Sequence, residues 1–164
     1  MVKDRTVRRL MLVLAATGLV AAPGAEAQKR AYPYFASIRA TKARMRKGPG
    51  RNYPASWLYV RPDLPVRVLD SYKEWRKVED PGGTTGWMQG NLLSDDRTAI
   101  VLGSEATLHA APDPGAKLLY RAAPGVVGRL SKCARGWCLF DVHGRVGYVE
   151  ANRLWGVEPQ EAVP

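Results

Sequence analysis

Cysteine and histidine are scarce in this chain, because its 164 residues contain only two of each: Cys133, Cys138, His109 and His143. A zinc site made of the two cysteines would need two more ligands, and neither histidine stands at zinc-finger spacing from them. A hydrolase needs a nucleophile, a base and oxyanion donors that converge on one pocket. The sequence contains no recognisable constellation of this kind, so we expect no enzyme, no catalytic residues, no metal and no cofactor.

Long hydrophobic runs and helical periodicity are also lacking. Beyond the N-terminal segment, no apolar run reaches the about 18 residues that indicate a membrane-spanning helix. No apolar period of 3.6 residues persists for three turns, so we expect no substantial helix there. The chain instead has 16 glycines and 12 prolines, spread between short runs of strand-forming residues. This pattern is typical of an all-β protein built from small barrels or sandwiches.

One stretch of the sequence occurs twice, from Trp75 to Trp87 and from Trp137 to Tyr148. In each copy an aromatic residue opens a run of strand formers, a turn with glycine follows, and a Gly-aromatic pair opens the next run, which predicts a β-hairpin. Flanking landmarks repeat at offsets of 63, 62 and 61 residues. The chain is therefore a duplicated unit, and we expect Arg97 to Leu102 to close the first copy. Because so small a unit is marginally stable alone, the copies should pack together, or the second should carry a covalent staple.

The N-terminus has the pattern of a cleavable signal peptide. A basic segment, residues 3–9, precedes an apolar segment, residues 10–22, and the small-x-small motif Ala25-Glu26-Ala27. Signal peptidase accepts this arrangement, and the apolar segment is short for a transmembrane helix. We expect residues 1–27 to be removed, leaving Gln28 as the first residue of a periplasmic or secreted protein. An uncleaved membrane anchor is the alternative.

Export determines how the two cysteines are interpreted. Cys133 and Cys138 are separated by four residues and lie where one strand candidate ends and the next begins. In an oxidising compartment such a pair favours a disulfide, and the neck of a hairpin brings its Cα atoms to a suitable distance. Two alternatives stay open at this stage, a metal site and a nucleophilic Cys138 with His143 as its base.

Several motifs together resemble a bacterial SH3 (SH3b) domain. In the first copy they are Met45-Arg-Lys-Gly-Pro-Gly-Arg-Asn-Tyr-Pro54, Leu64-Pro-Val-Arg-Val-Leu69, Trp75-Arg-Lys-Val-Glu-Asp80, Gly86-Trp-Met88 and Asn91-Leu-Leu93. The second copy is similar to exported tandem SH3-like proteins in its Cys-x4-Cys motif and in Leu154-Trp-Gly-Val157. The resemblance covers residues 34–157. It implies two tandem SH3-like β-barrels, residues 34–98 and residues 99–157, the second with a hairpin disulfide.

Strand alternation suggests where a ligand would bind. If Val78 points into the barrel, then Trp75, Lys77 and Glu79 lie on the opposite face of their strand. Two of these three side chains are charged, which indicates a solvated face with Trp75 at its end. The alternative is that Trp75 folds under the loop of residues 48–59 and caps the core. Met88 and Phe140 are expected in the core.

The first copy is the expected contact region, because it is the more basic one. The whole chain has a formal net charge of +10, and residues 36–98 contain 12 basic and 7 acidic residues, against 7 and 4 in residues 99–156. The candidate ligand-binding residues lie in the long loop and at the mouth of the hairpin. They are Tyr53, Trp57, Tyr59, Trp75 and Arg76.

The expected function is that of a non-catalytic binding or scaffold module of the cell envelope. The resemblance implies that such domains recognise peptidoglycan or peptides, so the expected partner is peptidoglycan or an envelope peptide or protein. A basic surface is also attracted to anionic lipid headgroups at the membrane surface. The alternative is binding of nucleic acid or another polyanion by a basic small barrel. The signal peptide argues against nucleic acid, and we expect none as a partner.

Overall fold

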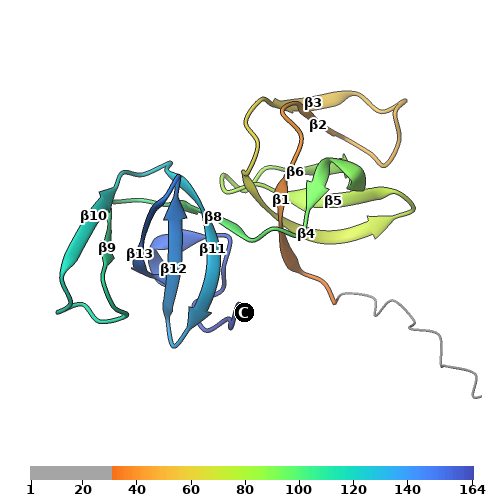
Figure 1. The fold of residues 1–164 in the computed structure, drawn as a ribbon. Helices are drawn as coiled ribbons and strands as arrows, with labels where there is room; N and C mark the ends of the chain where they lie inside the picture. The colour runs from red at the N-terminus through yellow and green to blue at the C-terminus, as the bar shows by residue number, and fades with distance from the viewer. Residues whose placement is uncertain (1–30) are drawn as a thin grey trace, which may run out of the picture.

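The computed structural model describes residues 31–164. The predicted signal peptide, residues 1–27, lies outside this range. No helix within the described part of the chain is long and apolar enough to cross a membrane. The described chain forms two seven-stranded sheets, and each sheet curls into its own small barrel (Figure 1).

The first barrel contains strands β1 to β7, hydrogen-bonded in the order β3-β2-β6-β5-β4-β1-β7. They are β1 (Tyr34–Ile38), β2 (Ala43–Arg46), β3 (Ala55–Tyr59), β4 (Pro65–Tyr72), β5 (Trp75–Glu79), β6 (Thr85–Gln89) and β7 (Leu93–Ser94). A 3-10 helix, η1 (Gly90–Leu92), separates the last two strands.

The second barrel repeats this arrangement with strands β8 to β14, in the order β10-β9-β13-β12-β11-β8-β14. They are β8 (Thr98–Val101), β9 (Ala106–His109), β10 (Leu118–Ala122), β11 (Val127–Ala134), β12 (Trp137–Val142), β13 (Arg145–Glu150) and β14 (Leu154–Trp155). A 3-10 helix, η2 (Ala151–Arg153), lies at the matching place. The predicted fold class, all-β with two tandem small barrels, is confirmed.

The expectation that Arg97 to Leu102 closes the first copy is wrong. Strand β8 pairs with β11 and β14 of the second sheet, just as β1 pairs with β4 and β7 of the first. The residues of β8 therefore open the second copy. The sequence landmarks began only at Ala43 and Ala106, after the first strand of each unit, so they could not assign this strand.

Each barrel has its own apolar core, and both residues predicted for the core, Met88 and Phe140, are fully buried. The repeated Gly-aromatic pair has a packing reason that the sequence did not reveal. A Cβ atom added to Gly86 on β6 would lie 2.4 Å from Cγ of Met45, and one added to Gly147 on β13 would lie 2.8 Å from Cβ of Leu108. Glycine thus allows the core side chain of the neighbouring strand to cross over β6 or β13.

The predicted disulfide is present. Cys133 on β11 and Cys138 on β12 are directly opposite each other, and their sulfur atoms are bonded, with Cα atoms 4.1 Å apart. The metal and nucleophile alternatives are excluded, because both sulfurs are used in this bond. The C-terminal segment covers the same place. Val163 exchanges two backbone hydrogen bonds with Cys133, of 2.9 and 3.1 Å, and is itself buried.

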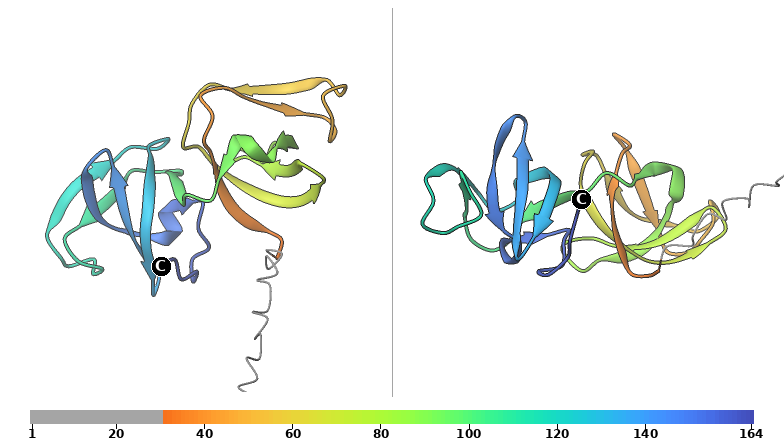
Figure 2. Two further views of the ribbon diagram at one scale, coloured as in Figure 1. Left: turned by 45° about the vertical axis from the view of Figure 1, so that its right-hand side comes forward. Right: turned by 60° about the horizontal axis from the view of Figure 1, so that its bottom comes forward.

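The two barrels lie side by side, and the chain ends near their junction (Figures 1 and 2). Phe35 of β1 is the centre of this junction. Its ring meets the ring of Trp155 edge-on at 5.3 Å, and the guanidinium groups of Arg67 and Arg97 lie 5.0 and 5.7 Å from its centroid. Aromatic and cation–π contacts of this kind each contribute modestly to stability.

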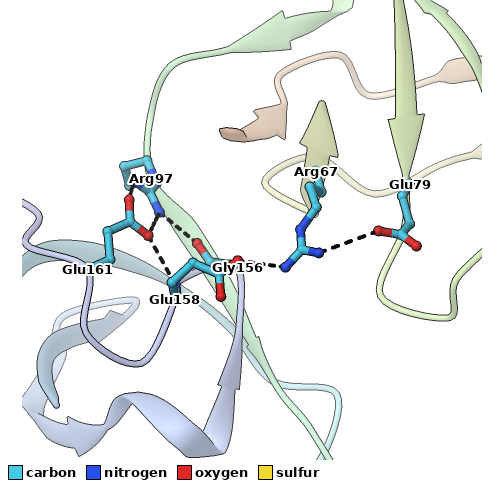
Figure 3. A network of polar contacts seen from close by, with 6 residues as sticks. All are labelled: Arg67, Glu79, Arg97, Gly156, Glu158 and Glu161. Carbon is cyan, nitrogen blue, oxygen red and sulfur yellow. Dashed lines mark hydrogen bonds and ion pairs between the residues drawn. The ribbon is translucent and has the colours of Figure 1, made fainter. Parts of the chain in front are cut away.

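Two glutamates of the C-terminal segment complete the junction (Figure 3). Glu158 accepts a 2.7 Å bond from Nη2 of Arg67, and Glu161 pairs with Arg97 through both carboxylate oxygens. Arg97 also donates a 2.8 Å hydrogen bond to the carbonyl of Gly156. Burial opposes ionisation of Glu161, but the hydrogen bonds from Arg97 and from the N–H of Glu158 outweigh it and lower its pKa.

Candidate ligand surface of the first barrel

Strands β2 and β3 form a hairpin at one edge of the first sheet (Figure 1). Met45 of β2 is opposite Trp57 of β3, and Ala43 is opposite Tyr59. Directly opposite residues of an antiparallel pair share a face, and Met45 and Ala43 are core residues. The side chains of Trp57 and Tyr59 therefore lie on the core-facing side of the hairpin, one strand further out.

The tip of the hairpin is a glycine-rich turn built around Tyr53. The N–H of Lys47 donates to the carbonyl of Pro54 at 3.1 Å, and Nη1 of Arg46 donates to the carbonyl of Tyr53 at 2.7 Å. The Tyr53 ring lies so close to Gly48 that an added Cβ would meet its Cδ1 at 2.4 Å. This packing fixes the ring, although Tyr53 is 43% exposed.

Tyr59 ties the base of the hairpin to the turn between β5 and β6. Its hydroxyl donates a 2.8 Å hydrogen bond to Oδ2 of Asp80. The other carboxylate oxygen of Asp80 accepts bonds from the N–H groups of Gly82 and Thr84, at 3.0 and 2.8 Å. Burial, the hydrogen bond and the charge of Asp80 all raise the pKa of Tyr59, so the phenol stays neutral and acts as a donor. Tyr59 is an anchor of the hairpin and is half-buried.

The outer strand of the hairpin exposes large apolar side chains on both faces. Trp57 is 54% exposed and Leu58, which points to the other side, is 48% exposed. Val60, directly after the strand, is 66% exposed. Exposed apolar side chains that cluster on one element indicate an interaction site more often than scattered ones do.

Two of the five predicted residues do not belong to this surface. Trp75 does lie opposite Gln89 and on the face away from Val78, as alternation predicts, but it is only 3% exposed. Trp75 is thus buried, as the alternative required, although no hydrogen bond or ring contact with the loop of residues 48–59 is seen, and a ligand cannot reach it without a rearrangement. Burial of the large indole ring removes much apolar area from water.

Arg76 is separated from the hairpin for a topological reason. It lies on β5, and strands β2 and β6 stand between β5 and β3. Its guanidinium turns back to the carbonyls of Lys73 and Trp75, at 3.0 and 3.1 Å. The structure thus brings together Tyr53, Trp57 and Tyr59 but leaves Trp75 and Arg76 outside the group.

The segment that carries the hairpin contains only basic charged residues. Residues 39–62 contain seven basic residues and no acidic one: Arg39, Lys42, Arg44, Arg46, Lys47, Arg51 and Arg61. No ion pair joins any of the seven to a carboxylate of residues 31–164. The matching segment of the second barrel, residues 102–125, contains two basic and two acidic residues. The two hairpin segments therefore differ more in net charge, +7 against 0, than the two whole copies do, +5 against +3.

Leu58 and Val60 are surface residues that sequence reasoning missed. The apolar run from Trp57 to Val60 predicted a strand, and an apolar strand is ordinarily buried on at least one side. The available signal was the series of basic residues before it and Arg61 directly after it, which is unusual for a strand in the middle of a sheet. An edge strand can be apolar and exposed.

The two histidines have structural surroundings. His109 contacts the carbonyl of Ala116 and the hydroxyl of Thr107 through its two ring nitrogens, at 2.9 and 3.0 Å. Its ring meets Trp137 edge-on at 5.9 Å. His143 occupies the turn between β12 and β13 with a positive φ of 52°. Within residues 31–164 no group of three or more His, Cys, Asp or Glu side chains could hold a metal ion.

Comparison with solved structures finds limited similarity. The structure of NlpC2 from Trichomonas vaginalis is 13% identical, covers 75% of this chain and 48% of its own, and superposes with a TM-score of 0.35. The structure of NlpC1 from the same organism is 11% identical, the match covers 77% of this chain and 46% of NlpC1, and the TM-score is 0.36. An NlpC/P60 family protein from Bacillus cereus is 14% identical, the match covers 79% of this chain and 58% of that protein, and the TM-score is 0.33. The present chain spans about half the length of these chains.

No curated protein sequence matches the chain. A family model does match, and it matches twice. The bacterial SH3 domain model covers residues 39–95, which fall in the first barrel, and residues 103–156, which fall in the second. The two matches together cover more than half of the sequence, one within each sheet, and the chain therefore belongs to the bacterial SH3 domain family as a tandem pair.

Proposed function

We propose that the protein is a non-catalytic binding module of the cell envelope, and that the β2–β3 hairpin of its first barrel recognises peptidoglycan or an envelope peptide. One observation carries the proposal. The hairpin presents two accessible aromatic rings, Tyr53 and Trp57, within a segment, residues 39–62, that contains seven basic residues and no acidic one. The second hairpin has no comparable charge.

The physical basis has two parts. Aromatic rings offer large, rigid apolar faces, on which sugar rings and the aliphatic parts of peptide stems can pack. Unpaired basic residues raise the local concentration of acidic partners and speed their association. The same charge is attracted to the acidic wall polymer and to anionic lipid headgroups, so the hairpin would hold the protein at the envelope.

Location in the periplasm or outside the cell is part of the proposal. It rests on the signal-peptide pattern of residues 1–27 and agrees with the disulfide between Cys133 and Cys138, since disulfides persist in oxidising compartments. Mass spectrometry of the protein from its host envelope should find Gln28 at the N-terminus. An intact Met1 form in membranes would instead establish the uncleaved anchor.

Co-sedimentation with purified sacculi tests the proposed function. Attraction between exposed charges is screened over about 8 Å at physiological ionic strength and over about 3 Å at 1 M, whereas aromatic packing is not. Binding should therefore weaken at high salt but persist in part. Absence of binding in both low and high salt would overturn the proposal.

The basic hairpin also favours a second candidate, the binding of nucleic acid or another polyanion. Such binding falls steeply with salt concentration because counterions are released. A protein that leaves the sacculi entirely at high salt, and that binds single-stranded DNA equally well at low salt, would support this second function. Selective retention on sacculi would support the envelope function.

A further inference from the structure

Strand β3 is an edge strand, and the structure leaves its outer edge open. Among the residues described, β3 pairs only with β2. The outer edge of such a strand presents unpaired N–H and C=O groups, which are a template for another strand. Natural proteins usually protect such an edge with a charged side chain, a proline or a covering loop.

The corresponding edge of the second barrel has this protection. Leu58 on β3 lies opposite Arg44 on β2. The equivalent residue of the second barrel is Arg121 on β10, which lies opposite Thr107 on β9. Arg121 is charged and forms a 2.7 Å ion pair with Glu105. At the same position of the first barrel stands an exposed leucine, so the two copies differ in the side chain that guards the edge.

We propose that β3 is a docking edge, to which an extended, acidic segment of a partner protein adds as a further antiparallel or parallel strand. The inference shares the hairpin with the proposed function and specifies one class of partner for it. Main-chain hydrogen bonds would supply affinity in this mode, and alternate side chains would supply specificity. Apolar side chains of the added strand would pack on Trp57 on one face and on Leu58 on the other.

Charge selects the partner. The segment that carries β3, residues 39–62, has seven basic residues and no acidic one, and this excess of positive charge would attract carboxylates of the added strand. Two copies of β3 pairing with each other would bring together two such segments, and the like charges disfavour that dimer. An acidic strand from another protein would form hydrogen bonds with the open edge and would be attracted by the basic residues beside it.

The hairpin is held in place before any partner arrives. Tyr59 is hydrogen-bonded to Asp80 at the base of β3, and Arg46 is hydrogen-bonded to the carbonyl of Tyr53 at the tip. Ser56 adds a 3.3 Å bond to the carbonyl of Met45 across the hairpin. A strand that is ordered in the free protein costs less entropy to bind than one that must first be ordered.

The test is a selection from a library of displayed random peptides of about eight residues, a usual strand length, on the purified protein. The selected peptides should be rich in Asp and Glu alternating with apolar residues. Leu58→Arg, which copies the second barrel, should weaken their binding at least about tenfold, a change of about 1.4 kcal/mol. The matched control Tyr120→Ala, at the place equivalent to Trp57 in the second barrel, should leave binding unchanged.

Backbone pairing has a further signature that needs no protein variant. Two versions of a selected peptide are N-methylated at alternate residues, one at the odd and one at the even positions. Because the N–H groups of alternate residues point to opposite sides of a strand, one version loses the donors that face β3 and the other keeps them. One methylated version should fail to bind, and the other should bind like the unmethylated peptide. Three results would overturn the inference: binding of both methylated versions, equal binding of the selected peptides to the natural protein and to Leu58→Arg, or a selection without acidic peptides. These outcomes are separate from co-sedimentation with sacculi, whose failure would overturn the proposed function alone.

Discussion

Tyr59 on β3 donates a 2.8 Å hydrogen bond to Asp80 in the β5–β6 turn, and this contact ties the exposed hairpin to the body of the first barrel. Asp80 is itself fixed by two backbone N–H groups of its turn. This side-chain pair thus anchors the outer strand of the hairpin, while its inner strand β2 is held by pairing with β6.

Removal of the phenol should loosen this anchor. Tyr59→Phe keeps the ring but removes the donor, and the loss of one such bond to a charged acceptor costs about 1.5–3 kcal/mol. Urea unfolding should detect the loss, and hydrogen exchange should rise in β2 and β3. Tyr120→Phe, on the exposed strand β10, is the control and should change stability by less than about 0.5 kcal/mol. Equal stability of both variants would show that the contact does not anchor the hairpin.

The glycine of the repeated Gly-aromatic pair should resist substitution. In Gly86→Ala the new methyl group would overlap Met45, whose Cγ lies 2.4 Å from the Cβ position. Overpacking of a core costs typically about 1–3 kcal/mol, so thermal unfolding should occur at a lower temperature. Gly115→Ala is the control, because the nearest atom there is 3.4 Å away. A Gly86→Ala variant as stable as the control would contradict the packing explanation.

Loss of the disulfide should affect the second barrel more than the first. Closing a short loop stabilises a fold by about 2 kcal/mol in the loop-entropy model. Hydrogen exchange of the variant Cys133→Ser, read by mass spectrometry, should therefore increase more in strands β8 to β14 than in β1 to β7. Free thiols in the natively folded, oxidised protein, or equal increases in both barrels, would count against this.

The junction between the barrels should weaken in acid. The pKa of Glu161 is lowered in the folded protein by its bonds to Arg97 and to the N–H of Glu158, against the opposing effect of burial. A carboxylate with a lowered folded pKa contributes stability above its unfolded pKa and loses it as the pH falls through the folded value. Glu161→Gln should therefore be less stable than the natural protein at pH 7. That difference should shrink as the pH falls below 4.5, the ordinary pKa of a glutamate, and a difference that does not change with pH would contradict this role.

The repeat, the all-β fold, the core residues Met88 and Phe140 and the disulfide could be predicted from the sequence, because each depends on local spacing. The position of β8 could not. Its residues follow the first copy directly, and only pairing with β11 and β14 assigns them to the second sheet.

The candidate site was predicted in part. Alternation placed Trp75 on the correct face, but its burial depends on what covers that face, which a strand pattern does not contain. Arg76 is near Trp75 in the chain yet lies three strands from β3 in the sheet. The exposure of Leu58 was not predicted, because the strand order of the whole sheet decides whether a strand lies at an edge.

We propose that the first hairpin, and not the second, holds the protein to the envelope. Co-sedimentation of sacculi with the matched variants Trp57→Ala and Tyr120→Ala tests it most directly, since both rings are exposed, at 54% and 41%, at equivalent positions. Trp57→Ala should weaken binding at low and at high salt, while Tyr120→Ala should bind like the natural protein. Equal binding by the two variants, or a larger loss in Tyr120→Ala, would contradict it.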